Sequence, residues 1–70
     1  MNLTKAESGQ EYIIDKININ DEELSDFLFS LGCYSGEAIT VIRHLKGSLI
    51  GAIKNGRYNI DNQLAEAIIV

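Results

Sequence analysis

The sequence has no tryptophan and no proline, and it contains a single cysteine, a single histidine and only two phenylalanines. Without tryptophan, we expect the core to consist mainly of Ile, Leu, Val and Ala side chains. The absence of proline excludes proline-rich linkers and docking motifs. One cysteine cannot form an internal disulfide, and no Cys/His cluster is available to hold a structural metal. These counts are typical of a protein from a reducing compartment, and we expect the cytoplasm.

Long hydrophobic runs and a secretory leader are also missing. The first ten residues, MNLTKAESGQ, lack the apolar centre of a signal peptide. No apolar run approaches the roughly 18–20 residues that cross a bilayer. Neither phosphate-binding glycine motif, GxxxxGK[ST] or GxGxxG, is present. We therefore expect a soluble protein that carries no cofactor.

Length and charge narrow the class further. The 70 residues can form one domain, 1–70, which buries only about 60% of its unfolded surface. The net charge of −4 argues against DNA as a partner, because duplex binding depends on neutralising phosphates. The charge is uneven: residues 1–37 sum to −6, whereas residues 38–60 sum to +4 and contain no acidic group. One face can therefore be basic although the whole chain is acidic.

A single amphipathic helix is predicted after residue 20. Asn20 is placed to cap it, and Glu23 to complete a capping box. The apolar residues then recur at i, i+3, i+4 and i+7, which makes one apolar stripe: Leu24, Phe27, Leu28 and Leu31. Gly32 suits the left-handed C-terminal cap. Phe29 points away from the stripe, so either a neighbouring segment such as the N-terminal turn partly covers it or it is an exposed anchor for a partner.

Short strands account for most of the remaining chain. Alternation of apolar and polar residues predicts them at 10–16, 37–45, 49–54, 57–60 and 67–70. In the longest strand, Ile39, Val41 and Arg43 should share one face, with His44 on the other. Gly51 indicates a bulge or sharp bend.

The ends and turns are also predicted. Leu3 and Ala6 should anchor a helical turn at the N-terminus. Asn55-Gly56 is typical of a tight hairpin turn with positive φ at both residues. Asp61 should cap a short helical turn over 62–66. Together these elements predict a mainly β fold, a small, strongly bent barrel of about five short strands with one helix after the first strand and a short C-terminal helical turn.

Candidates for catalysis are few. Cys33 and His44 are the only possible nucleophile and base, and no third group is present to orient them. Cys33 lies where a small apolar residue would seal the corner between helix and strand, and His44 lies near a strand end, where we expect it in solvent. We predict no enzyme activity and no metal site, because a single histidine cannot form a two-histidine iron site.

The order of residues through the corner resembles a known family. Leu28-x-x-Leu31-Gly32-x-x-x-Gly36-x-x-Ile39-x-Val41-Ile42-Arg43 resembles the LxxLGxxPGxxVxVxR signature of the FeoA family, ferrous iron transport protein A. The ending, Ile60-x-x-x-Leu64-Ala65-x-x-Ile68-x-Val70, is similar to that family's LxxxxAxxIxV finish. Ser35 occupies the position of the family's proline.

The resemblance implies an SH3-like barrel and a cytoplasmic accessory role in ferrous iron uptake. The partner would be the cytoplasmic side of FeoB, the membrane iron transporter with a GTP-binding domain, which would place the protein at the inner face of the membrane. We expect the contact surface to include the helix and the basic hairpins, through Asp26, Phe29, Arg43, Lys46 and Arg57.

Two other functions stay open at this stage. One is a regulatory module that binds protein or RNA without any link to iron transport, although few aromatic residues are available to stack on bases. The other is a small enzyme or a direct carrier of iron, which would have to use Cys33 or His44. The sequence leaves the oligomeric state open.

Overall fold

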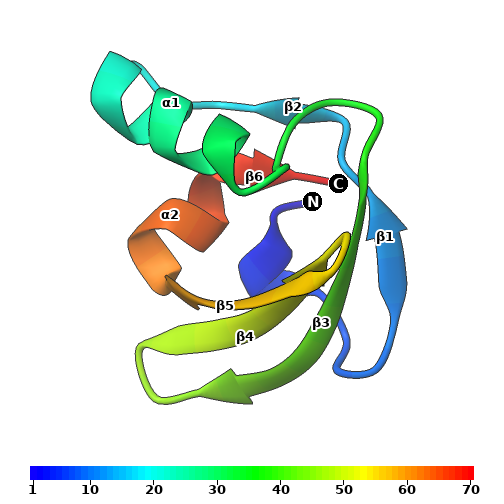
Figure 1. The fold of residues 1–70 in the computed structure, drawn as a ribbon. Helices are drawn as coiled ribbons and strands as arrows, with labels where there is room; N and C mark the ends of the chain where they lie inside the picture. The colour runs from blue at the N-terminus through cyan, green and yellow to red at the C-terminus, as the bar shows by residue number, and fades with distance from the viewer.

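Two antiparallel sheets of unequal size form the fold in the computed structural model, which describes residues 1–70 (Figure 1). A four-stranded sheet has the order β1-β3-β4-β5, and β2 pairs with β6 in a second sheet. The elements, in chain order, are a 3-10 helix Leu3–Lys5, β1 Glu11–Ile13, β2 Lys16–Ile17, α1 Glu22–Ser30, β3 Ala38–Leu45, β4 Ser48–Ile53, β5 Gly56–Asp61, α2 Asn62–Ala67 and β6 Ile68–Ile69. The predicted mainly β domain with one early helix and a short C-terminal helix is therefore confirmed.

The predicted first strand is divided into β1 and β2, which gives six strands instead of about five. The backbone N–H of Ile14 donates to the carbonyl of Glu37 beside β3 at 2.9 Å, whereas that of Asp15 donates to Ile69 in β6 at 2.7 Å. The chain thus changes hydrogen-bonding partner between two consecutive residues. The predicted alternation holds, because Ile14 is buried while Ile13 faces solvent. This change of partner joins the two sheets at one corner.

A bulge bends the longest strand. Val41 pairs with Gly51 and Arg43 pairs with Ile50, so Ile42 is the extra residue. The predicted bulge therefore lies opposite Gly51, on the neighbouring strand. A Cβ at Gly51 would come within 3.3 Å of the Ile39 and Ile60 side chains, so the glycine allows the strongly bent sheet to close on its core.

The bulge also corrects the predicted faces of β3. Because one residue is unpaired, the alternation shifts after Val41, and Arg43 lies on the outer face with Ile50 instead of sharing the inner face. His44 instead pairs with Leu49, which is fully buried. His44 is exposed as predicted, but its Nε2 also lies 2.7 Å from the carbonyl oxygen of Ala6, so it fastens the N-terminal turn to the sheet.

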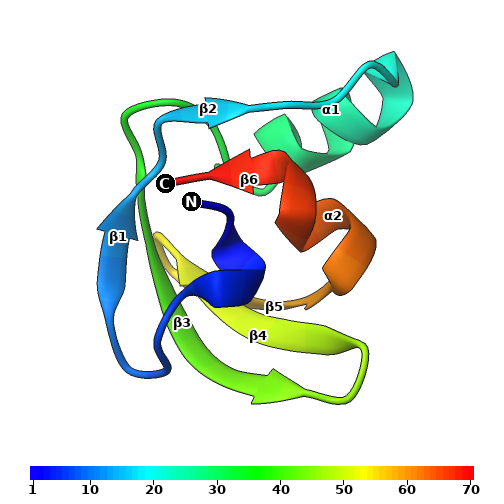
Figure 2. The same cartoon turned by 180° about the vertical axis from the view of Figure 1, so that it is seen from behind.

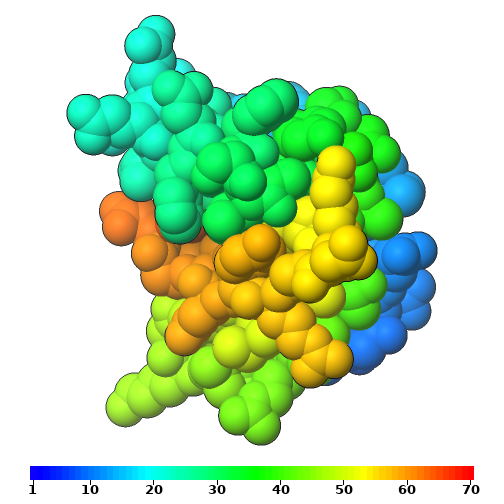
Figure 3. Space-filling view, in the orientation of Figure 1, coloured from blue at the N-terminus to red at the C-terminus, as the bar shows by residue number.

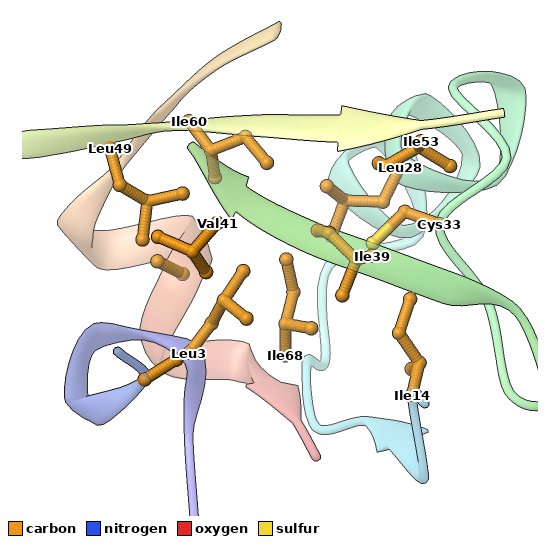
Figure 4. Packing of buried hydrophobic residues seen from close by; sticks show 12 residues of the cluster. Leu3, Ile14, Leu28, Cys33, Ile39, Val41, Leu49, Ile53, Ile60 and Ile68 are labelled. Carbon is orange, nitrogen blue, oxygen red and sulfur yellow. The ribbon is translucent and has the colours of Figure 1, made fainter. Parts of the chain in front are cut away.

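Aliphatic side chains fill the space between the sheets, the N-terminal turn and α2 (Figure 4). The core cluster consists of Leu3, Ala6, Ile14, Leu28, Cys33, Ile39, Val41, Leu49, Ile53, Ile60, Ala65 and Ile68. The expected anchoring by Leu3 and Ala6 is confirmed. Viewed from behind, the N-terminal turn lies beside α2, and the two chain ends are neighbours (Figure 2).

Helix α1 enters this core through one side chain only. Leu28 is fully buried, but Phe27 is 50% exposed and Leu24 is 39% exposed, so the apolar stripe is buried only in part. The helix extends from the corner of the barrel with most of its surface in water (Figure 1). Its cap is Asp21 and not Asn20, since Asp21 Oδ1 accepts from the N–H groups of Glu23 and Leu24. The next helix begins as predicted, with Asp61 accepting from Leu64 at 2.9 Å.

Candidate functional site

The end of α1 is held against the β4–β5 hairpin by a glycine turn. The N–H of Gly32 donates to Phe29 and that of Cys33 donates to Leu28, both at 2.9 Å, which is the Schellman arrangement of a helix C-terminus. Gly32 has φ of 91°, as predicted for the cap. A Cβ on it would lie 3.2 Å from Ile53 and from Lys54, so the helix end and the hairpin are in direct contact.

Two aromatic rings stack beside this turn. The Phe29 and Tyr34 centroids are 4.7 Å apart with an interplanar angle of 30°. Phe29 nevertheless remains 64% exposed, so its ring shields little of the core. A neighbouring segment thus covers Phe29 in part, but it is the corner that follows the helix and not the N-terminal turn.

Lys54 completes one side of this cluster. Its Nζ donates to the Tyr34 hydroxyl at 3.0 Å, lies 3.5 Å from Glu37 Oε1 and is 5.3 Å from the Tyr34 ring centroid. The hydrogen bond to Tyr34, followed by the negative charge of Glu37, raises the pKa of Lys54 above its ordinary value. The Lys54 side chain is half exposed, so its ammonium group is fixed in position yet accessible to a ligand.

The turn that carries Lys54 differs from the predicted one. Ile53 pairs with Gly56, so the central residues are Lys54 and Asn55, and the prediction of an Asn55-Gly56 turn is wrong by one position. Gly56 is required for space, because a Cβ there would lie 2.5 Å from Cζ of Tyr58. Lys54, with φ of 54°, takes the left-handed conformation that a glycine would adopt more easily.

These elements border a shallow groove of about 480 Å³, which we call the aromatic groove. It runs between the end of α1 with the following corner and the β4–β5 hairpin, seen in green and in yellow to orange in Figure 3. Its lining consists of Phe29, Ser30, Leu31, Gly32, Tyr34, Ile53, Lys54, Asn55, Gly56 and Tyr58. A surface with three aromatic side chains and one exposed cation is suited to binding a protein segment.

Of the five residues predicted to contact a partner, only Phe29 lines this groove, although all five are exposed. Arg57 follows Gly56 on β5, and Asp26 lies one turn before Phe29 on α1. Arg43 is on the outer face of β3, and Lys46 is in the β3–β4 turn. That turn is at the other end of β4, roughly 20 Å from Lys54 for a six-residue strand.

The sequence prediction did not include Tyr34, Lys54 and Tyr58 as site residues. A sequence signal exists for two of them, since Tyr34 stands two residues after the cap glycine and Tyr58 two residues after Gly56. Side chains close to glycine turns are often brought to a surface that the turn shapes. Lys54 belongs to the basic stretch 38–60, and its positive charge was its signal in the sequence.

A second groove, of about 570 Å³, lies between the start of α1 and α2. Ile19, Leu24 and Leu64 supply its apolar lining, and Asp61 and Glu66 its charged lining. None of the predicted contact residues borders it.

Groups suited to catalysis or metal binding do not converge. No three His, Cys, Asp or Glu side chains lie together in a way that could hold a metal ion. Cys33 is 1% exposed, and burial raises the pKa of its thiol from 9.0 to about 11, so the reactive thiolate is disfavoured. His44 is engaged with Ala6, as described above. No helix is long and apolar enough to cross a membrane.

Comparison with known proteins identifies the family. The FeoA domain matches residues 1–70. The chain belongs to the FeoA family. FeoA domains form a non-catalytic accessory family, in agreement with the expectation that the chain is not an enzyme. No curated protein sequence matches the chain.

The fold of a solved FeoA structure is the same. A crystal structure of an iron uptake regulatory protein (FeoA) superposes with a TM-score of 0.86, covering 97% of this chain and 91% of that one. The two sequences are 22% identical, so the similarity concerns the fold. The agreement confirms the architecture that the corner motif predicted.

Proposed function

We propose that this FeoA protein is a cytoplasmic accessory of ferrous iron uptake that binds the cytoplasmic part of a FeoB-type GTP-dependent transporter. Family membership over the whole chain supports the link to iron uptake. The role is binding and not chemistry, because the only thiol is buried and no metal-ligand cluster is formed.

The observation that carries a binding role is the exposed apolar surface of α1. Three large apolar side chains, Leu24, Phe27 and Phe29, face solvent on one nine-residue helix. Leu24 and Phe27 belong to the apolar stripe, whereas Phe29 lies on another side of the helix, beside the aromatic groove. Exposing such side chains lowers solubility without helping the fold, and we propose Phe29 as the one that a partner covers.

We propose a contact surface with an apolar part and a basic part. Phe29, with Asp26 at its border, forms the apolar part on α1, while Arg57, Arg43 and Lys46 form the basic part on the sheet. Charged residues at the border of an interface mainly affect the association rate and its dependence on salt, whereas a buried aromatic residue contributes more to affinity.

Titration against the isolated cytoplasmic domain of a FeoB-type transporter tests the proposal. We expect binding at micromolar protein concentrations, weakened by Phe29→Ala more than by Arg43→Ala. A useful control is Lys5→Ala, an exposed basic residue on the N-terminal turn. Absence of binding at these concentrations would contradict the role. Salt-sensitive binding to RNA in its place would favour a regulatory module unrelated to iron transport.

A further inference from the structure

Strand β5 forms a free edge of the four-stranded sheet. It pairs with β4 through a two-residue turn, so the residues that flank the turn, Ile53 and Gly56, form a hydrogen-bonded pair. Along antiparallel strands, hydrogen-bonded pairs alternate with pairs that exchange no hydrogen bonds. Arg57 and Asn59 fall in the intervening pairs, where backbone N–H and C=O groups point away from β4. No other segment bonds to them. β5 therefore presents two unpaired donors and two unpaired acceptors to solvent.

The aromatic groove lies beside this edge. Gly56 and Tyr58 belong both to β5 and to the groove lining, and Phe29 and Tyr34 face them from the end of α1. Tyr58 is on the inner face of the sheet, since it pairs with the buried Gly51. A strand added to β5 would thus place every second side chain against the aromatic groove.

The other face of the same edge is basic. Arg57 lies opposite Ala52 on the outer face, and Asn59 lies opposite Ile50, which in turn pairs with Arg43. Strands β3, β4 and the first five residues of β5 carry no acidic residue. The nearby carboxylate of Glu37 is already paired with Lys54, and Asp61 is at the far end of β5. An acidic residue on the outer face of an added strand would therefore meet Arg57.

Lys54 provides an independent sign of a ligand. It holds a φ of 54°, a conformation that is unfavourable for a lysine, in a turn where asparagine or glycine would be easier. Its ammonium group is fixed by Tyr34 and Glu37 at the mouth of the groove. Local strain that the fold does not need is often associated with function.

We propose that the β5 edge and the aromatic groove bind an extended segment of a partner protein in which acidic and apolar residues alternate. The segment adds an antiparallel or parallel strand to β5, with its apolar residues against Phe29, Tyr34 and Tyr58 and an acidic residue toward Arg57 on the outer face. A further acidic residue reaches Lys54 where the segment passes the β4–β5 turn. The inference rests on the proposed function for the identity of the partner protein, and it names the element of that partner which is recognised.

Two pairs of variants test the edge and the charge separately. Asn59→Pro removes the outward N–H while leaving the internal hydrogen bonds of the sheet intact, and Asn59→Ala is its control. Lys54→Asn removes the cation and relieves the left-handed lysine, and Lys5→Asn removes the same charge on the N-terminal turn, outside the lining of the aromatic groove. We expect Asn59→Pro and Lys54→Asn each to weaken binding of the transporter's cytoplasmic domain about tenfold, with both controls near wild type.

Synthetic peptides test the recognition pattern without the transporter. The first alternates glutamate with valine and phenylalanine, the second has the same composition with the acidic residues grouped, and the third has lysine in place of glutamate. We expect binding of the first alone. Amide hydrogen exchange of wild type adds a readout that needs no variant: the N–H groups of Arg57 and Asn59 should be unprotected in the free protein and protected by the first peptide.

The outcomes separate this inference from the proposed function. If the domain binds wild type but Asn59→Pro and Lys54→Asn bind it equally well, the transporter role stands and the β5 site is wrong. If the domain does not bind but the alternating peptide protects the amides of Arg57 and Asn59, the site stands with another partner. Equal binding of all three peptides, preferential binding of oligouridine RNA, or a dimer that Asn59→Pro dissociates would overturn the inference.

Discussion

The ring of Phe29 stacks on the ring of Tyr34 with a centroid distance of 4.7 Å, and both rings stand beside the glycine turn that ends α1. The stack keeps an exposed phenylalanine in one orientation before any partner arrives. Because the ring is ordered in advance, binding loses less side-chain entropy. A substitution of Phe29 should therefore change the affinity for a partner much more than it changes the free energy of unfolding.

Phe29→Ala should lower the free energy of unfolding by only about 0.5–1.5 kcal/mol, because an exposed stacked pair contributes about that much. Binding of the transporter domain should weaken about tenfold or more. Urea titration and calorimetric binding measure the two effects. The matched control is Leu28→Ala, one position earlier and fully buried, which should lower stability by about 2–4 kcal/mol. A larger stability loss for Phe29→Ala than for Leu28→Ala would place Phe29 in the core.

Alanine substitutions at Gly32 and Gly36 should show how much stability is lost to backbone strain and how much to a steric clash of the added Cβ. Both have φ of 91°, but a Cβ at Gly32 meets Ile53 and Lys54 at 3.2 Å, whereas a Cβ at Gly36 meets nothing within 4 Å. Gly36→Ala should therefore destabilise by about 1–2 kcal/mol from strain alone. Gly32→Ala should lose at least about 1 kcal/mol more, because the helix end must move away from the hairpin. Denaturant unfolding of both variants measures the difference, and equal losses would contradict the contact.

Gly56→Ala should be destabilising because its Cβ occupies the space of the Tyr58 ring. The loss should be about 1–2 kcal/mol, within the range found for overpacking. In a Tyr58→Ala background the same change should be nearly neutral, which gives a coupling energy of about 1 kcal/mol in a double-mutant cycle. Additive losses would show instead that position 56 needs glycine for its backbone conformation.

Burial of Cys33 predicts a pH dependence in the alkaline range. The pKa of its thiol is raised from 9.0 to about 11 in the folded protein, so the folded state favours the protonated form. Its contribution to stability is complete below about pH 9 and is lost as the pH rises through 11. The stability difference between wild type and Cys33→Ala should therefore fall between pH 8 and pH 11. The native thiol should also react with a disulfide reagent far more slowly than the unfolded chain.

Local rules predicted most elements because local interactions decide them. The helix, its glycine cap, the Asp61 cap and the N-terminal turn each depend on neighbouring residues, and all are present. The misplaced features depend on distant residues. The turn is at Lys54-Asn55 because the register of β4 on β5 pairs Ile53 with Gly56, and the bulge at Ile42 lies where β3 crosses Gly51 of the neighbouring strand.

The candidate site was predicted only in part for the same reason. Phe29 could be predicted as a contact residue because it departs from the apolar stripe of its own helix, and that departure is visible in the local sequence. Its neighbours Tyr34, Lys54 and Tyr58 come together only when the corner packs on the hairpin. The same limit applies to the burial of α1. The periodicity of its sequence predicts which face of the helix is apolar but not whether another segment covers that face.

Met1 and Val70 are joined by two main-chain hydrogen bonds, one in each direction, of 2.8 and 3.2 Å. The order of the elements around the barrel is therefore nearly circular, and a short linker could connect the two ends without moving a strand. New ends opened at the Lys46-Gly47 turn, where a Cβ at Gly47 meets nothing within 4 Å, would give a circular permutant with the same barrel. In such a molecule α1, the corner and β5 would keep their contacts, so the binding surface would be independent of where the polypeptide starts.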